Sequence, residues 1–301
     1  MTSVKKKGIL GDIRESLIKT LFQTSGMLAI IALLGIFALL LYTSVPAFKE
    51  ISLKEFLTST RWDPTSPEKP EYGLLAMIAS SIMVTAGALL IAFPLGVAVA
   101  AYLSDVASPR VREILKPVIE LLAAIPSVVV GFIGITITGP LISRIFKLNH
   151  GLTALNGSIL LAIMALPTII SISEDSLRTV PLSYTEASLA LGANRWQTLI
   201  RVKIPAAISG IVASLMLGLG RAIGETMTVL MATGNARAFP HGFLQSVRTL
   251  TATIAIELGE VPYYTTHYYA LFALGLALFI MTFGVNLTAD IILEKQRKKL
   301  Q

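Results

Sequence analysis

Long uncharged stretches alternate with polar segments along this chain. Residues 20–48 form a run of 29 residues without a charge, and residues 72–103 form a run of 32. About 20 apolar residues in a helix span a bilayer, so each run is long enough to cross one. Further apolar stretches cover residues 121–143, 151–173, 206–233 and 261–289. The pattern predicts an all-α polytopic membrane protein with six transmembrane helices.

The positive residues indicate how these helices cross the membrane. Of the 25 Lys and Arg residues, 16 lie before the first stretch, in segments 110–116 and 173–205, or in the tail. The segments between the other ends of the helices carry 8. Because Lys and Arg concentrate on the cytoplasmic side, we expect cytoplasmic termini. The first stretch is longer than the apolar core of a signal peptide, so we expect it to be retained.

Composition excludes several functional classes. The chain is 54% hydrophobic and 14% charged, whereas soluble domains are about 25% charged. The net charge of +7 is spread over separate loops and forms no single nucleic-acid-binding patch, so membrane lipid is the expected surroundings. With no Cys and three scattered His residues, we expect no thiol chemistry, no metal centre and no cofactor.

The polar segment 184–205, reading YTEASLALGANRWQTLIRVKIP, has a pattern of its own. Ala187, Ala190 and Leu191 recur at helical spacing, and Gly192 is typical of a helix end. Trp196 begins a second short amphipathic stretch. The sequence therefore predicts two short helices that meet at a glycine beside the membrane, where another protein could grip them.

This segment resembles the EAA motif of ABC importer permeases, in which Glu-Ala-Ala is followed at fixed spacing by Gly and by Ile-x-Leu-Pro. The spacing is intact here, with Ser, Val and Ile replacing Ala, Ile and Leu. The resemblance implies that the segment couples the chain to a separate ATP-hydrolysing subunit. The matching positions are Glu186, Ala187, Ser188, Gly192, Val202, Ile204 and Pro205.

Residues 72–105, 119–132, 220–235 and 247–260 are similar to the permeases of phosphate-specific importers, and the GETMTVLMATGN and VRTLTATIA runs resemble their C-type subunit. The family implies the type I (MetI-like) importer fold in a prokaryotic cell membrane. The implied partners are an A-type permease or a second copy of this chain, two ATP-binding subunits and an external phosphate-binding protein. Inorganic phosphate is the implied substrate.

The resemblance also suggests a division of the chain. Residues 1–48 comprise the cytoplasmic N-terminus and first helix, 49–71 a Pro-rich external loop, and 72–290 the permease core. Within that core, 173–206 is the cytoplasmic coupling loop, while 291–301 is a basic cytoplasmic tail. No G-x-x-x-x-G-K-[ST] loop occurs, so ATP would be bound by another polypeptide and the chain is not expected to be an enzyme.

Arg221 and Glu225 are charged residues within the fifth apolar stretch, four positions apart, which would place them on one helix face. Charges inside a span are costly and usually face a bundle interior or a water path. In one interpretation they form a translocation path with Thr226, where the Arg221 guanidinium binds a phosphate oxyanion and Glu225 orients that anion. In the other they neutralise each other or bridge to the partner permease.

Other polar residues allow two interpretations as well. Four small polar residues either line a polar path or form hydrogen bonds between helices. They are Ser127, Thr228, Thr233 and Asn235. His267 and the tyrosines near it are interpreted as an interfacial aromatic belt, with a ligand role as the alternative.

Two other classes of transporter fit parts of the sequence. A permease for another oxyanion, molybdate or sulfate, would share the EAA-like segment and differ in the fifth stretch. A secondary transporter would require inverted repeats, which are not evident, and would leave that segment unexplained. An intramembrane enzyme is disfavoured because H-E-x-x-H, G-x-S-x-G and Cys are absent.

Overall fold

A computed structural model describes the backbone of residues 9–300 and the side chains of residues 17–288, 290, 291 and 294. The first eight residues, with three of the predicted N-terminal lysines, lie outside the described residues. So do the side chains of the basic residues in the tail.

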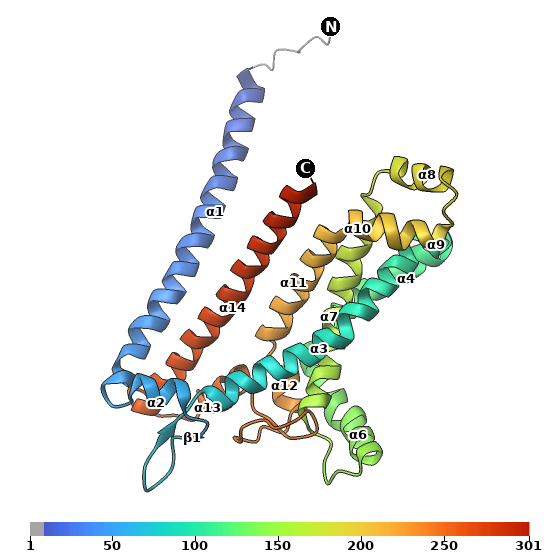
Figure 1. The fold of residues 1–301 in the computed structure, drawn as a ribbon. Coiled ribbons are helices and arrows are strands. Elements are labelled where there is room, and N and C mark those ends of the chain that lie inside the picture. Colours follow the sequence, from blue (N-terminus) through green and yellow to red (C-terminus); the bar gives the residue numbers. More distant parts are fainter. Residues whose placement is uncertain (1–8, 301) are drawn as a thin grey trace.

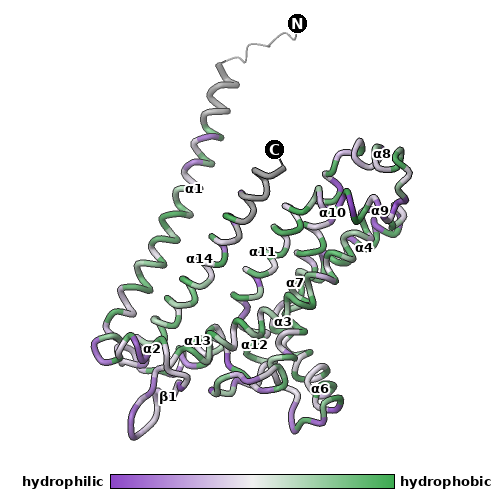
Figure 2. The backbone as a smooth tube through the Cα atoms, in the orientation of Figure 1, coloured by the Kyte–Doolittle hydropathy of each residue, from purple (hydrophilic) through white to green (hydrophobic). Residues whose placement is uncertain are grey.

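Among the described residues, five helical segments are long and apolar enough to cross a membrane, and a bent pair of helices raises the number to six. Four of the predicted stretches are confirmed as helices at close to their expected places. These are α1 (Ile9–Ser44), α3 (Leu75–Ala101), α7 (Ala154–Arg178) and α14 (Thr266–Leu300). Hydrophobic residues follow the length of these helices, while hydrophilic residues gather at their ends (Figure 2).

The third crossing begins later than predicted. It comprises α5 (Ser127–Ile133), a π-helical turn (Gly134–Thr138) and α6 (Gly139–Phe146). Before it, an amphipathic helix α4 (Pro109–Leu122) occupies residues that the sequence pattern divided between a polar segment and the span. Pro126 has φ −58° and ψ 135°, so the backbone is extended between α4 and α5. The residue before a proline disfavours the helical region, so Ile125 lies outside both helices.

The fifth crossing is broken, and the expectation of one continuous helix over residues 206–233 is wrong. A short α10 (Ile204–Ala206) leads into α11 (Ile208–Gly224), and the segment Arg195–Ala206 meets α11 at an angle of 69°. After Gly224 the chain is unwound at Glu225, whose ψ is 130°, before α12 (Met227–Ala232) begins. Irregular backbone at membrane depth is tolerated where it faces protein or a water-filled cavity.

The two ends of the bundle carry different structures (Figure 1). One end, called the α8–α9 side, holds α8 (Leu182–Ala190), α9 (Arg195–Thr198) and a π-helical turn (Leu199–Lys203). The start of α1 and the end of α14 lie at this same end (Figure 1). The opposite end, called the hairpin side, holds α2 (Leu53–Thr58), β1 (Trp62–Asp63), β2 (Glu71–Tyr72) and α13 (Leu250–Glu257).

The hairpin side contains more regular structure than the Pro-rich loop predicted for residues 49–71. β1 and β2 pair antiparallel, with Trp62 opposite Tyr72. Trp62 and Phe56 are each 2% exposed and pack in one apolar cluster with Leu271 and Leu274 of α14. The segment 49–71 is thus fastened to the bundle by buried aromatic side chains, which a count of its polar residues does not reveal.

The centre of the bundle is packed through small residues. Ala88 and Ala92 of α3 are fully buried in one cluster with Ala162 and Ala165 of α7. Close approach of the helices places polar groups in the core, where they must find partners. Asn156 is fully buried, and its amide donates to the carbonyl oxygens of Gly134 (3.0 Å) and Ala232 (3.1 Å).

Candidate functional site

The EAA-like segment folds as predicted into two short helices that turn at Gly192. Gly192 has φ +84°, in the left-handed region that favours glycine. Asn194 then caps α9, since its Oδ1 accepts from the Gln197 amide (2.8 Å) and the Gln197 side chain accepts from the Asn194 amide (2.9 Å). The sequence signal was local, because a turn glycine and a capping box need no distant contacts.

One side-chain contact joins the two helices of this segment. The hydroxyls of Ser188 and Thr198 lie 2.9 Å apart and both residues are buried. Ser188 stands where the family motif has a second Ala, so this hydrogen bond depends on the substitution. The contact links α8 directly to α9.

The remaining motif residues divide between surface and core. Glu186, Ala187 and Pro205 are exposed, whereas Val202 and Ile204 are half-buried. Ile204 packs against an apolar cluster that contains Leu177 of α7. The outer surface carries a groove of about 580 Å³, lined by Tyr184, Ala187, Ser188, Leu191, Gly192, Ala193, Gln197, Arg201 and Val202.

Arg221 and Glu225 do not share one helix face. Arg221 lies in the last turn of α11, and Glu225 lies in the unwound residues after it. Among the described residues no ion pair joins the two. The Arg221 guanidinium donates to the carbonyl oxygen of Ala123 (3.3 Å), and the Glu225 carboxylate accepts from the Thr228 amide (3.3 Å). The mutual neutralisation that the sequence allowed is therefore wrong.

Two interrupted helices meet around these charges. The helices that follow the two breaks are in contact, because the Thr228 hydroxyl of α12 donates to the Ser127 carbonyl oxygen of α5 (3.1 Å). Thr251 of α13 donates to the Glu225 carbonyl oxygen (2.9 Å). Arg221, Glu225 and Thr226 are all half-buried. Discontinuous helices of this kind form substrate sites in other transporters, because their unwound backbone offers polar groups inside the membrane.

The sequence analysis missed the contribution of the 123–126 break to this site. Pro126 was the available signal, since a proline after an apolar pair marks a helix boundary. Thr233 and Asn235 belong elsewhere: the Thr233 hydroxyl donates to the Val229 carbonyl oxygen, and the Asn235 amide donates to the Leu230 carbonyl oxygen. Both hydrogen bonds stay within one segment, so they are not the bonds between helices that the sequence analysis gave as the alternative to a polar path.

A second polar cluster lies on the hairpin side, centred on Glu257 of α13. Its carboxylate accepts from the Trp62 indole (2.9 Å) and the Arg248 guanidinium (2.7 Å), and lies 2.9 Å from the His267 ring. Burial raises the pKa of Glu257, but the hydrogen bonds from His267 and Trp62 and the charges of His267 and Arg248 hold it below its usual value.

This Glu257 cluster corrects the interpretation of His267. The His267 side chain is largely buried in the cluster, whereas Tyr263 and Tyr264 are exposed. The aromatic belt therefore does not include the histidine. Its partner Glu257 lies ten residues away, beyond the range of the i+3 and i+4 helical spacings, so the pair could not be predicted from local spacing.

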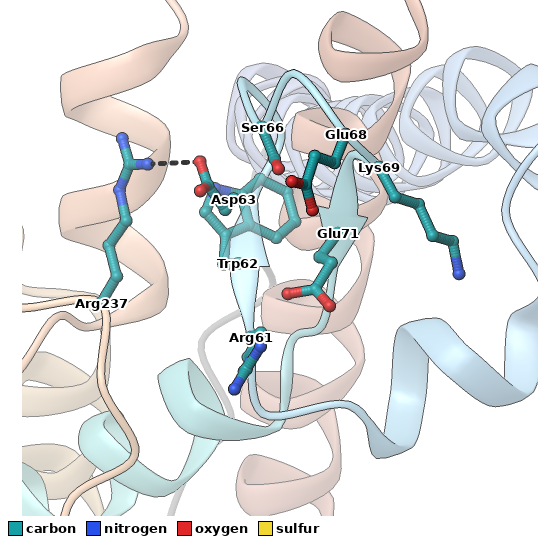
Figure 3. A pocket seen from close by; sticks show the side chains of 8 residues that line it. All are labelled: Arg61, Trp62, Asp63, Ser66, Glu68, Lys69, Glu71 and Arg237. Atoms are coloured by element: carbon teal, nitrogen blue, oxygen red, sulfur yellow. Dashed lines mark hydrogen bonds and ion pairs between the residues drawn. The ribbon is translucent and has the colours of Figure 1, made fainter.

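Arg237 extends the cluster to the surface. Its guanidinium lies 3.5 Å from Glu257 and 3.2 Å from Asp63 of the hairpin (Figure 3). Together with Arg61, Lys69 and nearby carboxylates it lines a cavity of about 390 Å³. In the part of the chain that the structure describes, no group of three or more His, Asp or Glu side chains is placed to hold a metal ion.

Comparison with known proteins assigns the family. Residues 92–300 match the family described as "Binding-protein-dependent transport system inner membrane component". The chain belongs to that family. The match begins within α3, covers the rest of the bundle, and includes both the α8–α9 segment and the two interrupted helices. The resemblance to ABC importer permeases is thus confirmed.

Individual relatives of this transport component are also similar over most of its length. It is 42% identical over 233 residues, 77% of this chain and 75% of the relative, to the "Probable ABC transporter permease protein YqgH" of Bacillus subtilis. It is 36% identical over 249 residues, 76% of this chain and 74% of the relative, to the "Phosphate transport system permease protein PstC" of Mesorhizobium japonicum.

A solved structure shares the fold of this transport component. The structure is that of a bacterial ABC transporter involved in the import of the acidic polysaccharide alginate. The match covers 96% of this chain and 99% of that one, with a TM-score of 0.62 and 16% sequence identity. The multi-pass, all-α importer fold expected from the sequence is confirmed.

Proposed function

We propose that the chain is a permease subunit of an ATP-driven phosphate importer and forms half of its translocation pore. The observation that carries the proposal is the 36% identity to a phosphate transport system permease over three quarters of the chain. The half-buried Arg221 beside two interrupted helices supports an anionic substrate, because a guanidinium stays charged and can bind two phosphate oxygens.

The pore would be completed by an A-type permease. Two ATP-binding subunits would dock on the α8–α9 side, and an external phosphate-binding protein would deliver the anion on the hairpin side. Closure of the ATP-binding subunits would move α8 and α9 and reorient the spans. The chain itself performs no covalent chemistry in this scheme.

The α8–α9 segment has the surface needed for docking. Leu191 is 90% exposed and lines the groove of about 580 Å³, while Trp196 is 64% exposed and lines a second cavity of about 530 Å³ on this segment. Large apolar side chains exposed outside the membrane mark interaction sites when they gather in one place. Glu186 adds an exposed carboxylate to the same surface.

A substitution at Gly192 tests the docking role. A side chain at φ +84° strains the turn although no atom would clash with its Cβ, and Asp also adds a charge at the groove. We expect Gly192→Asp to insert normally while the ATP-binding subunit no longer co-purifies. Gly242→Asp is the matched control, since Gly242 is equally open and lies on the hairpin side. Retention of the ATP-binding subunit by Gly192→Asp would count against the docking role.

Substitutions at Arg221 test the translocation path. We expect Arg221→Ala and Arg221→Glu to abolish phosphate uptake while assembly of the complex is unchanged. Arg144→Ala, at an exposed arginine of α6, serves as the control. Normal uptake by either Arg221 variant at normal protein level would remove Arg221 from the path.

Competition in the same vesicles identifies the substrate. ATP-dependent phosphate uptake should be reduced by arsenate and unaffected by sulfate or molybdate. ATP-dependent uptake of one of those other anions instead would support the permease function and refute phosphate as the substrate.

The distribution of Lys and Arg supports a cytoplasmic position for the α8–α9 side and both termini. The chain has no Cys, so a single introduced thiol reports orientation without background. A membrane-impermeant maleimide added to intact cells should label Thr65→Cys on the hairpin side and leave Ser183→Cys on α8 unlabelled. The reverse labelling would invert the topology.

A further inference from the structure

The α8–α9 segment meets the turn that follows α3 through a half-buried ion pair. Lys203 Nζ lies 2.5 Å from Asp105 Oδ1, with the two side chains 13% and 21% exposed. The Ser104 hydroxyl donates to the other carboxylate oxygen of Asp105. Among the described side chains of residues 17–291, this pair is the one ion pair or side-chain hydrogen bond that joins segment 182–203 to another part of the fold.

Both partners lie in π-helical turns. Asp105 belongs to the turn Tyr102–Val106 that follows α3, and Lys203 ends the turn Leu199–Lys203 that follows α9. π-Helical turns are rare and occur frequently at functional sites. Two such turns therefore face each other across one ion pair.

The ion pair lies next to the bend across which a movement of α8 and α9 must pass to reach the spans. Lys203 is followed closely by the 69° bend that separates Arg195–Ala206 from α11. A bend between short helices can act as a hinge. If α8 and α9 moved freely about this bend, their displacement would not reach α3 or the breaks near Arg221.

The other contacts at this place are apolar. Leu199 packs with Ala100 and Ala101 of α3 and with Leu177 of α7. Apolar contacts are non-directional and allow packed helices to slide. A charge-assisted hydrogen bond, in contrast, has a defined length and direction. The ion pair is therefore the contact that fixes the position of the α8–α9 segment relative to α3.

We propose that Asp105 and Lys203 are positioning residues that brace the segment before the bend against α3, so that displacement of α8 and α9 moves the spans. This proposal rests on the proposed coupling function. It adds to that function the residues that transmit the movement of α8 and α9 to the spans. These residues lie outside the EAA-like positions proposed to bind the ATP-binding subunit.

The test compares phosphate imported with ATP hydrolysed in vesicles that contain the full complex and the binding protein. Wild-type uptake tests the proposed function separately. We expect Lys203→Met and Asp105→Asn to keep the ATP-binding subunit and continue to hydrolyse ATP, while phosphate imported per ATP falls roughly tenfold. Lys69→Met is the matched control, because Lys69 pairs with Glu55 at 3.1 Å on the hairpin side.

A double variant with the two charges exchanged distinguishes loss of the ion pair from loss of either original side chain. The double variant Asp105→Lys with Lys203→Asp should recover most of the phosphate imported per ATP. An unchanged ratio in the single variants would overturn the proposal. Loss of the ATP-binding subunit from those variants, or a double variant that stays as poorly coupled as they are, would overturn it as well.

Discussion

Replacement of Glu257 by Leu should destabilise the hairpin side of the permease strongly. The Glu257 carboxylate is 7% exposed and receives hydrogen bonds or ion pairs from β1, from the 237–248 loop and from α14. The substitution removes all of these contacts at once. The segment 49–72 would then be held mainly by the apolar packing of Trp62 and its neighbours.

The magnitude follows from the charge that the substitution leaves behind. The Arg248 side chain is 10% exposed and would lose the carboxylate 2.7 Å from it. Removing one partner of a buried ion pair costs about 3–5 kcal/mol of the free energy of unfolding, because the remaining charge stays desolvated. This is a large part of the roughly 5–15 kcal/mol by which folded proteins are typically stable.

Thermal unfolding of the purified permease in detergent measures the effect, with limited proteolysis of segment 49–72 as a local readout. Glu68→Leu is the control, since Glu68 is an exposed carboxylate between the same two strands. The Glu257→Leu variant should unfold at a clearly lower temperature and be cleaved faster in that segment. Equal Tm values for the two variants would refute the reasoning.

Three smaller predictions use the same unfolding and co-purification assays. Because the folded-state pKa of Glu257 lies below its usual 4.5, its stabilising contribution is full above that pH and lost as the pH falls through the lower value; Glu257→Gln should therefore flatten this acid-induced loss of Tm. Asn156→Leu removes the side-chain hydrogen bonds to two buried carbonyl oxygens and should cost about 2 kcal/mol of unfolding free energy. Trp196→Ala should leave Tm nearly unchanged and reduce co-purification of the ATP-binding subunit several-fold, because an exposed Trp contributes to docking and little to folding. A lower Tm of Trp196→Ala without loss of the ATP-binding subunit would contradict this assignment of Trp196 to docking.

The sequence by itself determined the features that depend on neighbouring residues. Uncharged runs of about 20 residues or more located the membrane helices, since crossing the bilayer requires an apolar side chain at most positions of one segment. Gly192 located the turn between α8 and α9, since a left-handed residue disfavours other side chains. Both signals are local, and the structure reproduces both.

Tertiary structure decided which distant residues meet. Thr228 binds the Ser127 carbonyl oxygen at a separation of 101 residues, Trp62 binds Glu257 at a separation of 195, and Lys203 reaches Asp105 at a separation of 98. Period and spacing within one segment carry no information about such pairs. They arise because buried polar groups must find partners wherever packing brings them together. Arg221 illustrates the difference: the sequence identified it as a charge inside a span, but packing selected the Ala123 carbonyl oxygen, and not Glu225, as its partner.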